Sequence, residues 1–348
     1  MRDFEKVYDF YNLYKAHLKA RRGKQCAREV VDFELNLAAR LTELSESIRD
    51  GSYSLSDYYE FKVYDPKIRN IHALHYKDRV FQHCLCDEVI APLIERKLIY
   101  DKAACRKEKG THFAMGRLSH FMSSYYWKEN SANGYVLKCD IRKYFENIDH
   151  EILKNKLAKV FSDPDILRLI FMIIDSYEIR PGKGLPLGNQ SSQWFALYYL
   201  DSLDRLVKEK LKVSFYTRYM DDAVLIHQDR DYLKYCLECM DDHLRNHLGL
   251  EFNQKTQIVP MRSGVDYLGF HFYLTDSGKV IRKMRTSAKK RFKKKLKLMK
   301  NAYSAGKMEL EDITPVIVSY KAHFAHGHNH GLMKNALNSF VLHRSGYC

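Results

Sequence analysis

The chain has 348 residues, and 45% of them are hydrophobic, which is enough for one large core or for two or three moderate ones. Lys and Arg number 58 against 43 Asp and Glu, which gives a formal net charge of +15. Such an excess predicts a polyanionic partner, and nucleic acid is the first candidate because neutralising its phosphates releases counterions. A basic protein that is merely soluble is the alternative.

The N-terminus and the cysteines indicate the compartment. Residues 1–6 include acidic side chains and no long apolar run, which predicts neither a signal peptide nor a membrane anchor. No other segment is apolar enough to span a bilayer. The eight cysteines are scattered, which favours reduced thiols over a disulfide framework. We therefore expect a cytoplasmic protein without a membrane partner.

The first hundred residues alternate between helical and strand patterns. Residues 2–49 predict two helical segments, and the basic break between them at 20–24 is equally compatible with a nucleic-acid contact and a solvated turn. Residues 59–74 then predict a β-hairpin closed by Asp65-Pro66-Lys67. Its cations, Lys67 and Arg69, suit the phosphates of a triphosphate, although two exposed basic residues on a hairpin are the alternative.

Helical spacing returns over residues 78–98, and a basic loop follows at 105–112. This loop carries Arg106 and Lys109, which suit the phosphates of a template or a nucleotide. A flexible basic loop without a ligand is the alternative.

Two short apolar strands each end in carboxylates. Residues 135–141 include Asp140, and residues 213–226 form a strand pair whose turn contains Tyr219-Met220-Asp221-Asp222. Adjacent like charges repel strongly where the dielectric constant is low, which predicts a bound cation. Mg²⁺ prefers carboxylates and substrate phosphates, and two such ions clamp the attacking and leaving oxygens of a phosphoryl transfer. A solvated Asp-Asp turn is the alternative.

Three segments, in order and at plausible spacing, resemble the reverse transcriptases. Tyr219 to Asp222 resembles the catalytic Tyr-x-Asp-Asp box, residues 140–145 resemble the first catalytic box, and residues 184–193 resemble the box between them. The resemblance implies an α/β (α+β) right-hand polymerase with an antiparallel palm sheet and a helical thumb. Its expected divisions are N-terminal helices and fingers at 1–135, a palm at 136–275 with an interleaved fingers segment at about 151–195, and a basic thumb and tail at 276–348.

The resemblance also implies an RNA-directed DNA polymerase and gives roles to particular residues. Asp140, Asp221 and Asp222 would hold two Mg²⁺ ions, with the backbone carbonyl of Ile141 as a further ligand. Lys255, in the fourth box at 249–256, would protonate the departing pyrophosphate, unless it is an ordinary surface residue. The implied nucleotide-binding residues are Lys67, Arg69, Phe145, Leu187, Gly188 and Gln193. The implied template- and primer-binding residues are Arg106, Lys109, Tyr219, Met220, Leu268, Gly269, Lys289, Lys293 and Lys297.

Two of these positions carry a specific chemical expectation. Phe145 matches the aromatic steric gate, whose ring would clash with a ribose 2′-hydroxyl, although an isolated aromatic residue is more often part of a core. Leu187 replaces the glutamine of the retroviral enzymes. An aliphatic residue there, together with Ser192-Gln193, resembles the enzymes of diversity-generating retroelements and implies errors opposite template adenine.

The C-terminal third predicts elements that would hold the primer and template. Residues 265–270 resemble the primer-grip hairpin, for which an ordinary edge hairpin is the alternative. Residues 282–300 contain eleven Lys or Arg and no acid, and they predict a basic amphipathic helix along the nucleic-acid backbone. An anionic membrane surface would also attract it, but no second anchor is evident.

The four histidines of 320–330 favour RNA or a protein partner over a metal, and Cys236 and Cys239 lack a second pair for zinc.

The expected partners are an RNA template, a DNA or RNA primer and deoxynucleoside triphosphates. The resemblance also implies a cognate structured RNA and leaves open a small basic accessory protein. Two other functions stay open. One is a defence-associated reverse transcriptase that copies its own noncoding RNA against phage, and the other is a nucleic-acid-binding subunit without catalysis.

Overall fold

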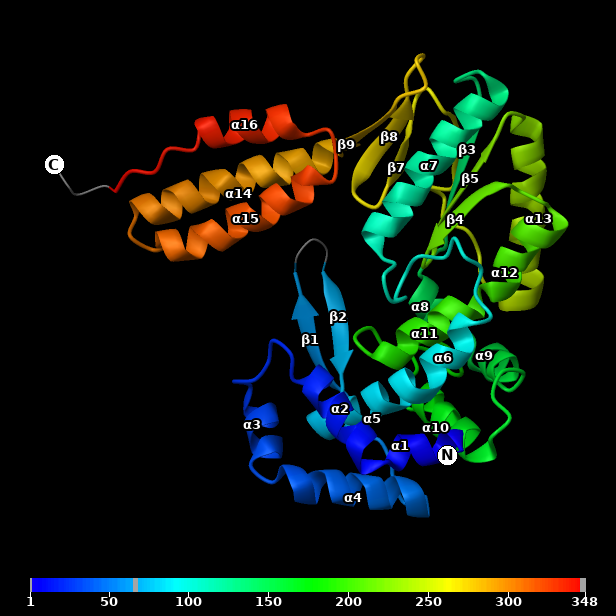
Figure 1. Cartoon of the computed structure of the whole chain (residues 1–348), viewed down its shortest axis with the longest axis vertical. Coiled ribbons are helices and arrows are strands. Elements are labelled where there is room, and N and C mark those ends of the chain that lie inside the picture. The colour runs from blue at the N-terminus through cyan, green and yellow to red at the C-terminus, as the bar shows by residue number, and fades with distance from the viewer. Residues whose placement is uncertain (1, 65–67, 345–348) are drawn as a thin grey trace. The chain divides into compact units, whose positions relative to one another are not determined.

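The computed structural model describes residues 2–64 and 68–344, and the chain folds into two compact units (Figure 1). Unit 1 comprises residues 1–107, 140–212 and 236–255, and unit 2 comprises residues 108–139, 213–235 and 256–348. Each unit therefore draws on three separate stretches of the sequence, so neither core forms from one continuous segment.

Unit 1 is mostly helical, with one two-stranded sheet. Its first stretch contains α1 (Asp3–Tyr8), α2 (Phe10–Ala20), α3 (Arg28–Glu34), α4 (Leu37–Asp50), β1 (Tyr59–Val63), β2 (Arg69–Ala73), α5 (Tyr76–Leu85), a π-helical turn η1 (Cys86–Ile90) and α6 (Ala91–Glu95). Its second stretch contains α8 (Tyr144–Asn147), α9 (His150–Leu157), α10 (Pro164–Asp175), α11 (Gln190–Tyr199), α12 (Asp201–Arg205) and η2 (Leu206–Lys210). The long helix α13 (Arg230–Leu248) begins in unit 2 and ends in unit 1.

The described part of unit 2 contains two antiparallel sheets and four helices, of which α16 is the shortest. Its elements are α7 (Thr111–Glu129), β3 (Tyr135–Asp140), β4 (Phe215–Tyr219), β5 (Asp222–His227), β6 (Gln257–Pro260), β7 (Val265–Tyr267), β8 (Phe270–Leu274), β9 (Val280–Met284), α14 (Thr286–Ser304), α15 (Leu310–Ala325) and α16 (His330–Asn338). The four strands of the larger sheet lie in the order β4-β5-β3-β6, and the smaller sheet has the order β7-β8-β9. The prediction of a mixed helix and sheet protein with antiparallel sheets is confirmed.

The N-terminal helices are shorter and more numerous than the sequence predicts. The backbone of Asp9 is extended, and its carboxylate accepts a 2.8 Å hydrogen bond from the amide of Asn12. This N-cap ends α1 and starts α2, because an Asp side chain satisfies an amide that the first helical turn leaves unpaired. A second break, at Asn36, separates α3 from α4. Four helices therefore replace the two predicted segments.

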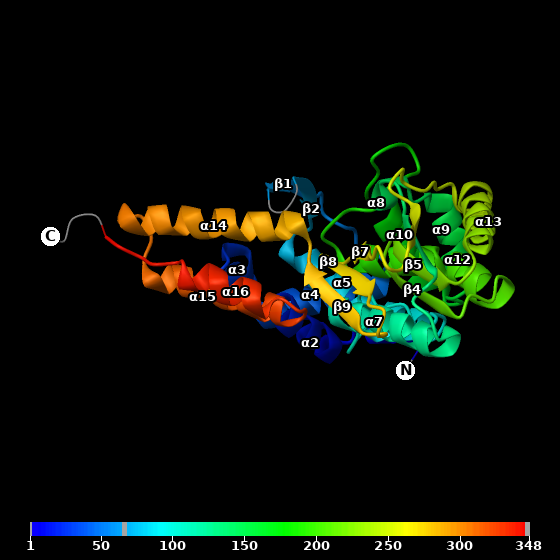
Figure 2. The same ribbon diagram turned by 90° about the horizontal axis from the view of Figure 1, so that it is seen from above.

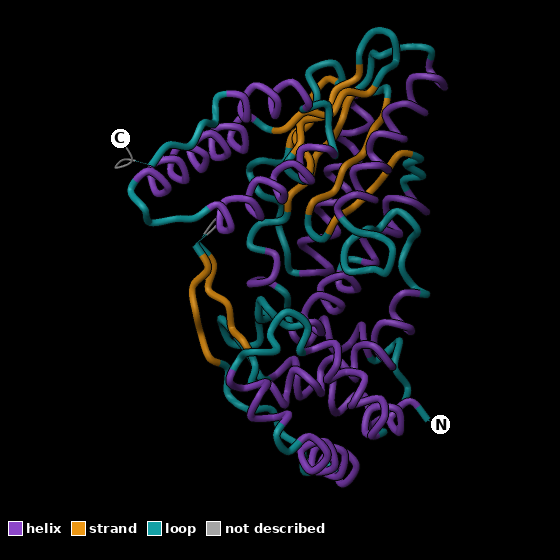
Figure 3. The backbone as a smooth tube through the Cα atoms, turned by 60° about the vertical axis from the view of Figure 1, so that its left-hand side comes forward, coloured by secondary structure: helices purple, strands orange, loops and turns teal. Residues whose placement is uncertain are grey.

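Other predicted elements agree with the structure. β1 and β2 pair in antiparallel register from Tyr59↔Ala73 to Val63↔Arg69, and Figure 3 shows them as a two-stranded ribbon. Their predicted turn, 65–67, lies outside the described residues. Asp149 caps α9 as expected, because its carboxylate accepts hydrogen bonds from the amides of Glu151 and Ile152.

Helix α7 covers the larger sheet of unit 2. Phe121 and Tyr125 on α7 contact the ring of Phe215 on β4, with centroid distances of 5.7 and 6.2 Å. These residues come from stretches almost a hundred positions apart, and aromatic pairs of this kind add to the free energy gained from burial. The contact fixes the strand that leads into the Tyr219 to Asp222 segment.

The basic C-terminal segment is partly a strand, which corrects the prediction of one helix from 282 to 300. Residues 280–284 form β9, in which Arg282 pairs with Phe272 of β8. Arg285 is extended, and α14 starts only at Thr286, because the edge of the sheet offers the preceding backbone hydrogen bonds that a helix would not. The predicted apolar stripe of α14 is confirmed, since Phe292, Leu296 and Met299 are buried.

Within residues 2–64 and 68–344, no helix combines the length and apolar character needed to cross a membrane. The seven cysteines in this part of the chain are free.

A buried ion pair holds together two stretches of unit 1. The ammonium group of Lys102 lies 3.4 Å from Oδ2 of Asp204 on α12, and both side chains are completely buried. Lys102 also donates to the backbone carbonyl of Leu197 on α11. A buried charge is tolerated only when it is paired, so each partner depends on the other.

We predict that Lys102→Met lowers the free energy of unfolding by about 3–5 kcal/mol, because Asp204 then stays buried without its cation. Urea unfolding followed by circular dichroism measures this. The double variant Lys102→Met/Asp204→Leu should recover part of the loss. Lys234→Met, which removes an exposed partner of Asp231, is the control and should change stability little. Equal effects of Lys102→Met and Lys234→Met would contradict the prediction.

Candidate active site

The two adjacent acids lie at a tight hairpin turn in unit 2. β4 and β5 are antiparallel, and their last pair is Tyr219↔Asp222, so Met220 and Asp221 form a two-residue turn. Met220 has φ +54°, a left-handed conformation that the commonest turns of this length reserve for Asn or Gly. A side chain there costs about 1–2 kcal/mol, so surrounding contacts must hold the turn in place.

Arg218 supplies one of these contacts. Its guanidinium is completely buried in β4, and it donates a hydrogen bond to the backbone carbonyl of Met220. Tyr267 on β7 is buried beside the same strand. Burial raises the pKa of its phenol, and the negative charge of Asp222 raises it further. The acid-bearing turn thus rests on a buried layer of polar and charged groups.

Lys138 connects the turn to the next strand. β3 lies beside β5 in the sheet, and the Lys138 ammonium is 3.4 Å from Oδ2 of Asp222. The same ammonium donates a 2.7 Å hydrogen bond to the backbone carbonyl of Asp266 on β7. Because side chains alternate along a strand, Asp140, two residues after Lys138, projects from the same face of β3.

The backbone around Asp140 joins the fourth predicted box in unit 1. The carbonyl of Asp140 accepts a 2.7 Å hydrogen bond from the amide of Asn253, and Ile141 forms an isolated β-bridge with Phe252. Lys255 follows in this segment, with its amide 3.1 Å from the side-chain oxygen of Asn253 and its own side chain exposed. The structure therefore brings the backbone of the Lys255 segment to the end of β3.

The donor chemistry of these acids suits Mg²⁺. Among residues 2–64 and 68–344, no three His, Cys, Asp or Glu side chains gather as a metal-binding group. Lys138 supplies the positive charge next to Asp222. Mg²⁺ commonly takes only one or two protein carboxylates and completes its shell with water and substrate phosphates. The carboxylates of the turn fit such an ion, and the assignment of Asp140, Asp221 and Asp222 as ligands stays a prediction.

Unit 1 contains a cavity of 610 Å³, which is within the size range of small-molecule sites. It brings together three of the predicted nucleotide-binding residues, Arg69, Phe145 and Leu187. The remaining lining residues are Glu60, Ile68, Asn70, His72, Glu146, Tyr177, Glu178, Ile179 and Leu185. The cavity thus collects side chains from the β1–β2 hairpin, from α8 and from the loops on either side of residue 180.

Sequence reasoning missed His72 and Tyr177 in the wall of this cavity. Nδ1 of His72 lies 3.1 Å from a carboxylate oxygen of Glu60, its partner across the hairpin, and the His72 ring is 4.6 Å from that of Tyr177. The hairpin register could have revealed the Glu60–His72 pair, because the predicted turn at 65–67 sets these residues opposite each other. Nothing in the sequence near Tyr177 indicates that it reaches the cavity.

The structure gives a reason for the glycine at position 188 that the sequence does not reveal. Its φ is +125°, and a Cβ atom there would lie 3.2 Å from Cγ2 of Ile71 and 3.5 Å from the carbonyl of His72. The neighbouring carbonyl of Leu187 accepts a 3.3 Å hydrogen bond from the amide of His72. The missing side chain therefore lets the loop approach β2, in addition to any contact with a nucleotide.

Several other predicted contacts lie elsewhere. Gln193 is outside the lining of the cavity, and its side-chain oxygen accepts a 2.9 Å hydrogen bond from the thiol of Cys105. The Lys109 ammonium lies 4.8 Å above the ring of Phe113. Lys67 is outside the described residues.

Arg106 makes its bonds within unit 1, and its template contact stays a prediction. Its Nε lies 3.1 Å from Glu95, and its Nη1 donates to the carbonyls of Ile99 at 2.9 Å and Lys102 at 3.1 Å. The side chain is 10% exposed. A guanidinium with these bonds stabilises the loop, because it satisfies carbonyl groups that have no helix or strand partner.

Residues 265–270, which resemble the primer grip, lie in the hairpin of β7 and β8, and the contact with a primer stays a prediction. The turn of this hairpin consists of Leu268 and Gly269, with φ values of +46° and +88°, and two positive angles in a row suit the twist of a two-residue hairpin. A Cβ atom at Gly269 would meet no other atom within 4 Å, so the space beside the turn is open. This geometry leaves room for the backbone of a ligand.

The three predicted lysines of α14 fall into two separate sites. Lys289 lines a cavity of 340 Å³, together with Asp266, His271, Lys283, Met284, Arg285, Thr286 and Ser287. There Asp266 contacts Nδ1 of His271 at 2.9 Å and Nε of Arg285 at 2.8 Å. Lys293 and Lys297 instead line a groove between α14 and α16.

Comparisons with known proteins identify the region that carries these sites. A family model described as "Reverse transcriptase (RNA-dependent DNA polymerase)" matches residues 64–272. The structure resembles telomerase from Candida albicans in complex with a TWJ fragment of telomeric RNA, with a TM-score of 0.51, 14% identity, and coverage of 84% of this chain and 56% of that one. It also resembles apo telomerase from Candida tropicalis truncated from its C-terminal domain, with a TM-score of 0.50, 14% identity, and coverage of 71% and 60%.

These likenesses concern the fold, which is the mixed helix and sheet fold of the polymerases. The chain spans a little over half the length of the telomerase chains that it matches. A comparison with curated protein sequences finds no match.

We predict that Arg218→Met lowers the free energy of unfolding by about 1–3 kcal/mol, because the carbonyl of Met220 loses a buried donor. Arg218→Lys keeps the charge and should lose less. Urea unfolding followed by near-ultraviolet circular dichroism measures both changes. Arg142→Met removes a guanidinium that is 61% exposed and serves as the control. Wild-type stability of Arg218→Met would show that the turn does not depend on this contact.

Proposed function

Because the chain belongs to the reverse transcriptase family, we propose that it is an RNA-directed DNA polymerase that makes cDNA from an RNA template. The family match over residues 64–272 carries this proposal, since it includes β3, the hairpin turn of β4 and β5, and most of the cavity lining of unit 1. The net charge of +15 supports it, because an RNA–DNA hybrid presents two phosphate backbones.

The reaction would join a deoxynucleotide to the 3′ end of a primer. The primer 3′-oxygen forms a bond to the α-phosphorus, the bond to the bridging oxygen breaks, and pyrophosphate leaves. Asp140, Asp221 and Asp222 would hold two Mg²⁺ ions, with the carbonyl of Ile141 as a further ligand. When bound, the ions activate the 3′-hydroxyl and neutralise the triphosphate.

The protein's own groups would then fix the geometry of this step. Arg218 holds the turn through the carbonyl of Met220, and Lys138 holds Asp222. Lys255 would donate a proton to the pyrophosphate as it leaves, a role that its exposed side chain permits. Positioned groups of this kind accelerate phosphoryl transfer because its transition state is stabilised chiefly by charge and alignment.

The 610 Å³ cavity of unit 1 would receive the incoming nucleotide. Arg69 would hold phosphate oxygens, and a guanidinium can do so with two parallel hydrogen bonds. Phe145 would pack against the sugar and reject a 2′-hydroxyl, and Leu187 would border the base. The support for this assignment is that all three side chains line one cavity of suitable size.

The primer and template would lie against residues of unit 2. The open side of the Leu268–Gly269 turn and the cavity that contains Lys289 are both close to Asp266, which contacts Lys138 through its carbonyl. One of the matched telomerases was solved with an RNA fragment, and a structured RNA is the partner that we propose for this chain as well.

The finer assignment rests on Leu187. We propose an error-prone enzyme of a diversity-generating retroelement, because an aliphatic side chain offers the base no hydrogen bond and so tolerates imperfect pairing. A defence-associated enzyme that copies a noncoding RNA would share the chemistry and differ in its error spectrum.

We predict that the chain incorporates deoxynucleotides on a primed RNA template only with Mg²⁺, and that Asp221→Ala/Asp222→Ala lowers the rate by at least about 10³, because charge stabilisation in the transition state is lost. Gel-resolved primer extension measures this. Asp241→Ala/Asp242→Ala removes an equivalent adjacent pair from α13 and should keep activity. No incorporation by the wild type, even with RNA copurified from its native host, would instead indicate a nucleic-acid-binding subunit.

We predict that sequenced products of the wild type show an excess of errors opposite template adenines, and that Leu187→Gln reduces this excess because an amide restores a polar contact. Ile179→Gln makes the same change in another wall of the cavity and is the control. A uniform error spectrum in the wild type would exclude the retroelement assignment and leave the polymerase assignment intact.

A further inference from the structure

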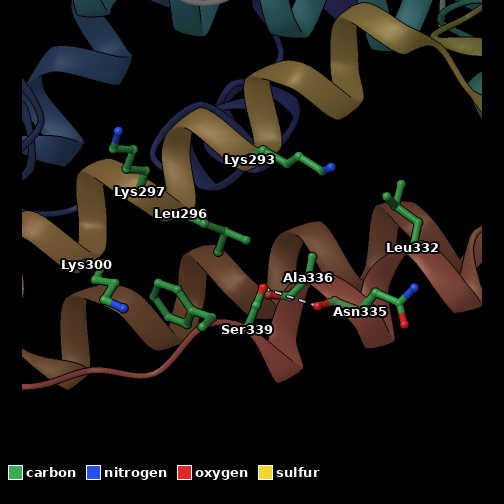
Figure 4. Close-up of a pocket in the computed structure, with 9 residues that line it drawn as sticks. Lys293, Leu296, Lys297, Lys300, Leu332, Asn335, Ala336 and Ser339 are labelled. Carbon is green, nitrogen blue, oxygen red and sulfur yellow. Dashed lines mark hydrogen bonds between the residues drawn. The ribbon is translucent and has the colours of Figure 1, made fainter.

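A groove runs between two helices at the C-terminal end of unit 2. Figure 2 shows α14, α15 and α16 side by side, and Figure 4 shows the groove from close range. Its volume is 460 Å³, and its lining consists of Lys293, Leu296, Lys297, Lys300, Leu332, Asn335, Ala336, Ser339 and Phe340. These residues belong to α14 and α16 and to the two positions after α16, so the groove lies wholly within one unit.

One wall of the groove is a row of lysines. Lys293, Lys297 and Lys300 are four and three residues apart on α14, which separates them by about 6 and 4.5 Å along the helix axis. None of them has a carboxylate partner among residues 2–64 and 68–344, and neither α14 nor α16 contains an acidic residue. The positive charge of this wall is therefore not neutralised by the protein, which favours an anionic occupant.

The floor and the opposite wall have a different character. Leu296, Leu332 and Ala336 form an apolar floor, and the half-buried Phe340 is also part of the lining. The hydroxyl of Ser339 is already bonded to the carbonyls of its own helix, whereas Asn335 carries an exposed amide. An aromatic ring and an amide next to a row of cations can contact the faces, edges and phosphates of nucleotides.

We propose that this groove binds a single-stranded segment of RNA. Its bases lie against Phe340 and the apolar floor, its phosphates follow the lysine row, and Asn335 contacts a base edge. A duplex suits the groove less well, because its bases are stacked on one another and do not reach an apolar floor. The sequence predicts Lys293 and Lys297 as contacts of the template and primer, whereas the groove gives them a separate task. None of the groove residues belongs to the acid-bearing turn or lines the nucleotide cavity, so the proposal goes beyond the polymerase reaction.

The lysines of α14 provide a matched test on the full-length chain. Lys293→Ala/Lys297→Ala removes two charges from the groove, and Lys290→Ala/Lys294→Ala removes two charges at the same spacing outside its lining. Fluorescence anisotropy with a labelled single-stranded RNA of about 12 nucleotides, at several salt concentrations, gives the affinity and its salt dependence. We expect the groove variant to bind about tenfold more weakly, with a salt slope smaller by about 1.4, and the control to change much less.

A second measurement locates the bases. RNA that contains 4-thiouridine should crosslink under ultraviolet light to a peptide that includes residues 332–340, as identified by mass spectrometry. Phe340→Ala should lose affinity by about tenfold and Phe340→Tyr should keep it, because both aromatic rings can stack on a base. A duplex of the same sequence should depend on the two lysine pairs equally.

The proposal would be overturned if both double-lysine variants lost the same affinity for single-stranded RNA, or if no crosslink fell within residues 332–340. Either result would indicate diffuse electrostatic attraction. Displacement of the RNA from the wild type by an acidic amphipathic peptide, with no crosslink to α16, would overturn it in favour of a protein partner. The Asp221→Ala/Asp222→Ala variant should bind the single strand as the wild type does. Failure of polymerisation alone therefore leaves the groove proposal standing.

Discussion

The buried guanidinium of Arg218 is the constraint on which the acid-bearing turn depends. A guanidinium buried inside a sheet is stable only when its N–H groups donate hydrogen bonds. One N–H group of Arg218 donates to the carbonyl of Met220. That bond holds Met220 in a left-handed conformation, which it would otherwise avoid. The turn then starts β5 at Asp222, where the Lys138 ammonium on the neighbouring strand balances the carboxylate. The strained backbone of Met220 thus gives the buried Arg218 an acceptor, and the hydrogen bond from Arg218 keeps Met220 in its strained conformation.

Ionic contacts continue from this turn to the start of α14. The Lys138 ammonium reaches both Asp222 and the carbonyl of Asp266, and the Asp266 carboxylate contacts Nε of Arg285, the N-cap residue of α14. Each contact joins elements that are distant in the sequence. The Lys138–Asp222 pair is partly buried and is therefore screened less than the exposed Asp266–Arg285 pair. Because the Lys138 ammonium also bonds to the carbonyl of Asp266, it can fix β7 relative to the acid-bearing turn.

The elements with strong local signals could be predicted from the sequence. The β4–β5 hairpin, the β7–β8 hairpin and the Asp149 cap all follow from alternation and capping chemistry within a few residues. The errors arise where a distant partner decides. The segment 280–284 is a strand because β8 lies beside it. The internal bonds of Arg106 to Glu95 and to its own loop are likewise not visible in the sequence. Neither neighbour can be inferred from local periodicity.

The roles of the lysines on the basic helix α14 also depend on distant neighbours that the sequence does not reveal. Its composition correctly predicts a helix with a buried apolar stripe, but lysines spaced around 3.6 residues per turn face several directions. The structure places Lys289 in a cavity with Asp266, whereas Lys293 and Lys297 border the groove with α16. A carboxylate lies in the first environment and none lines the second. The same residue type on one helix is therefore suited to two different tasks: a charge-balanced contact near the β7–β8 hairpin, and an unneutralised surface for a separate polyanion.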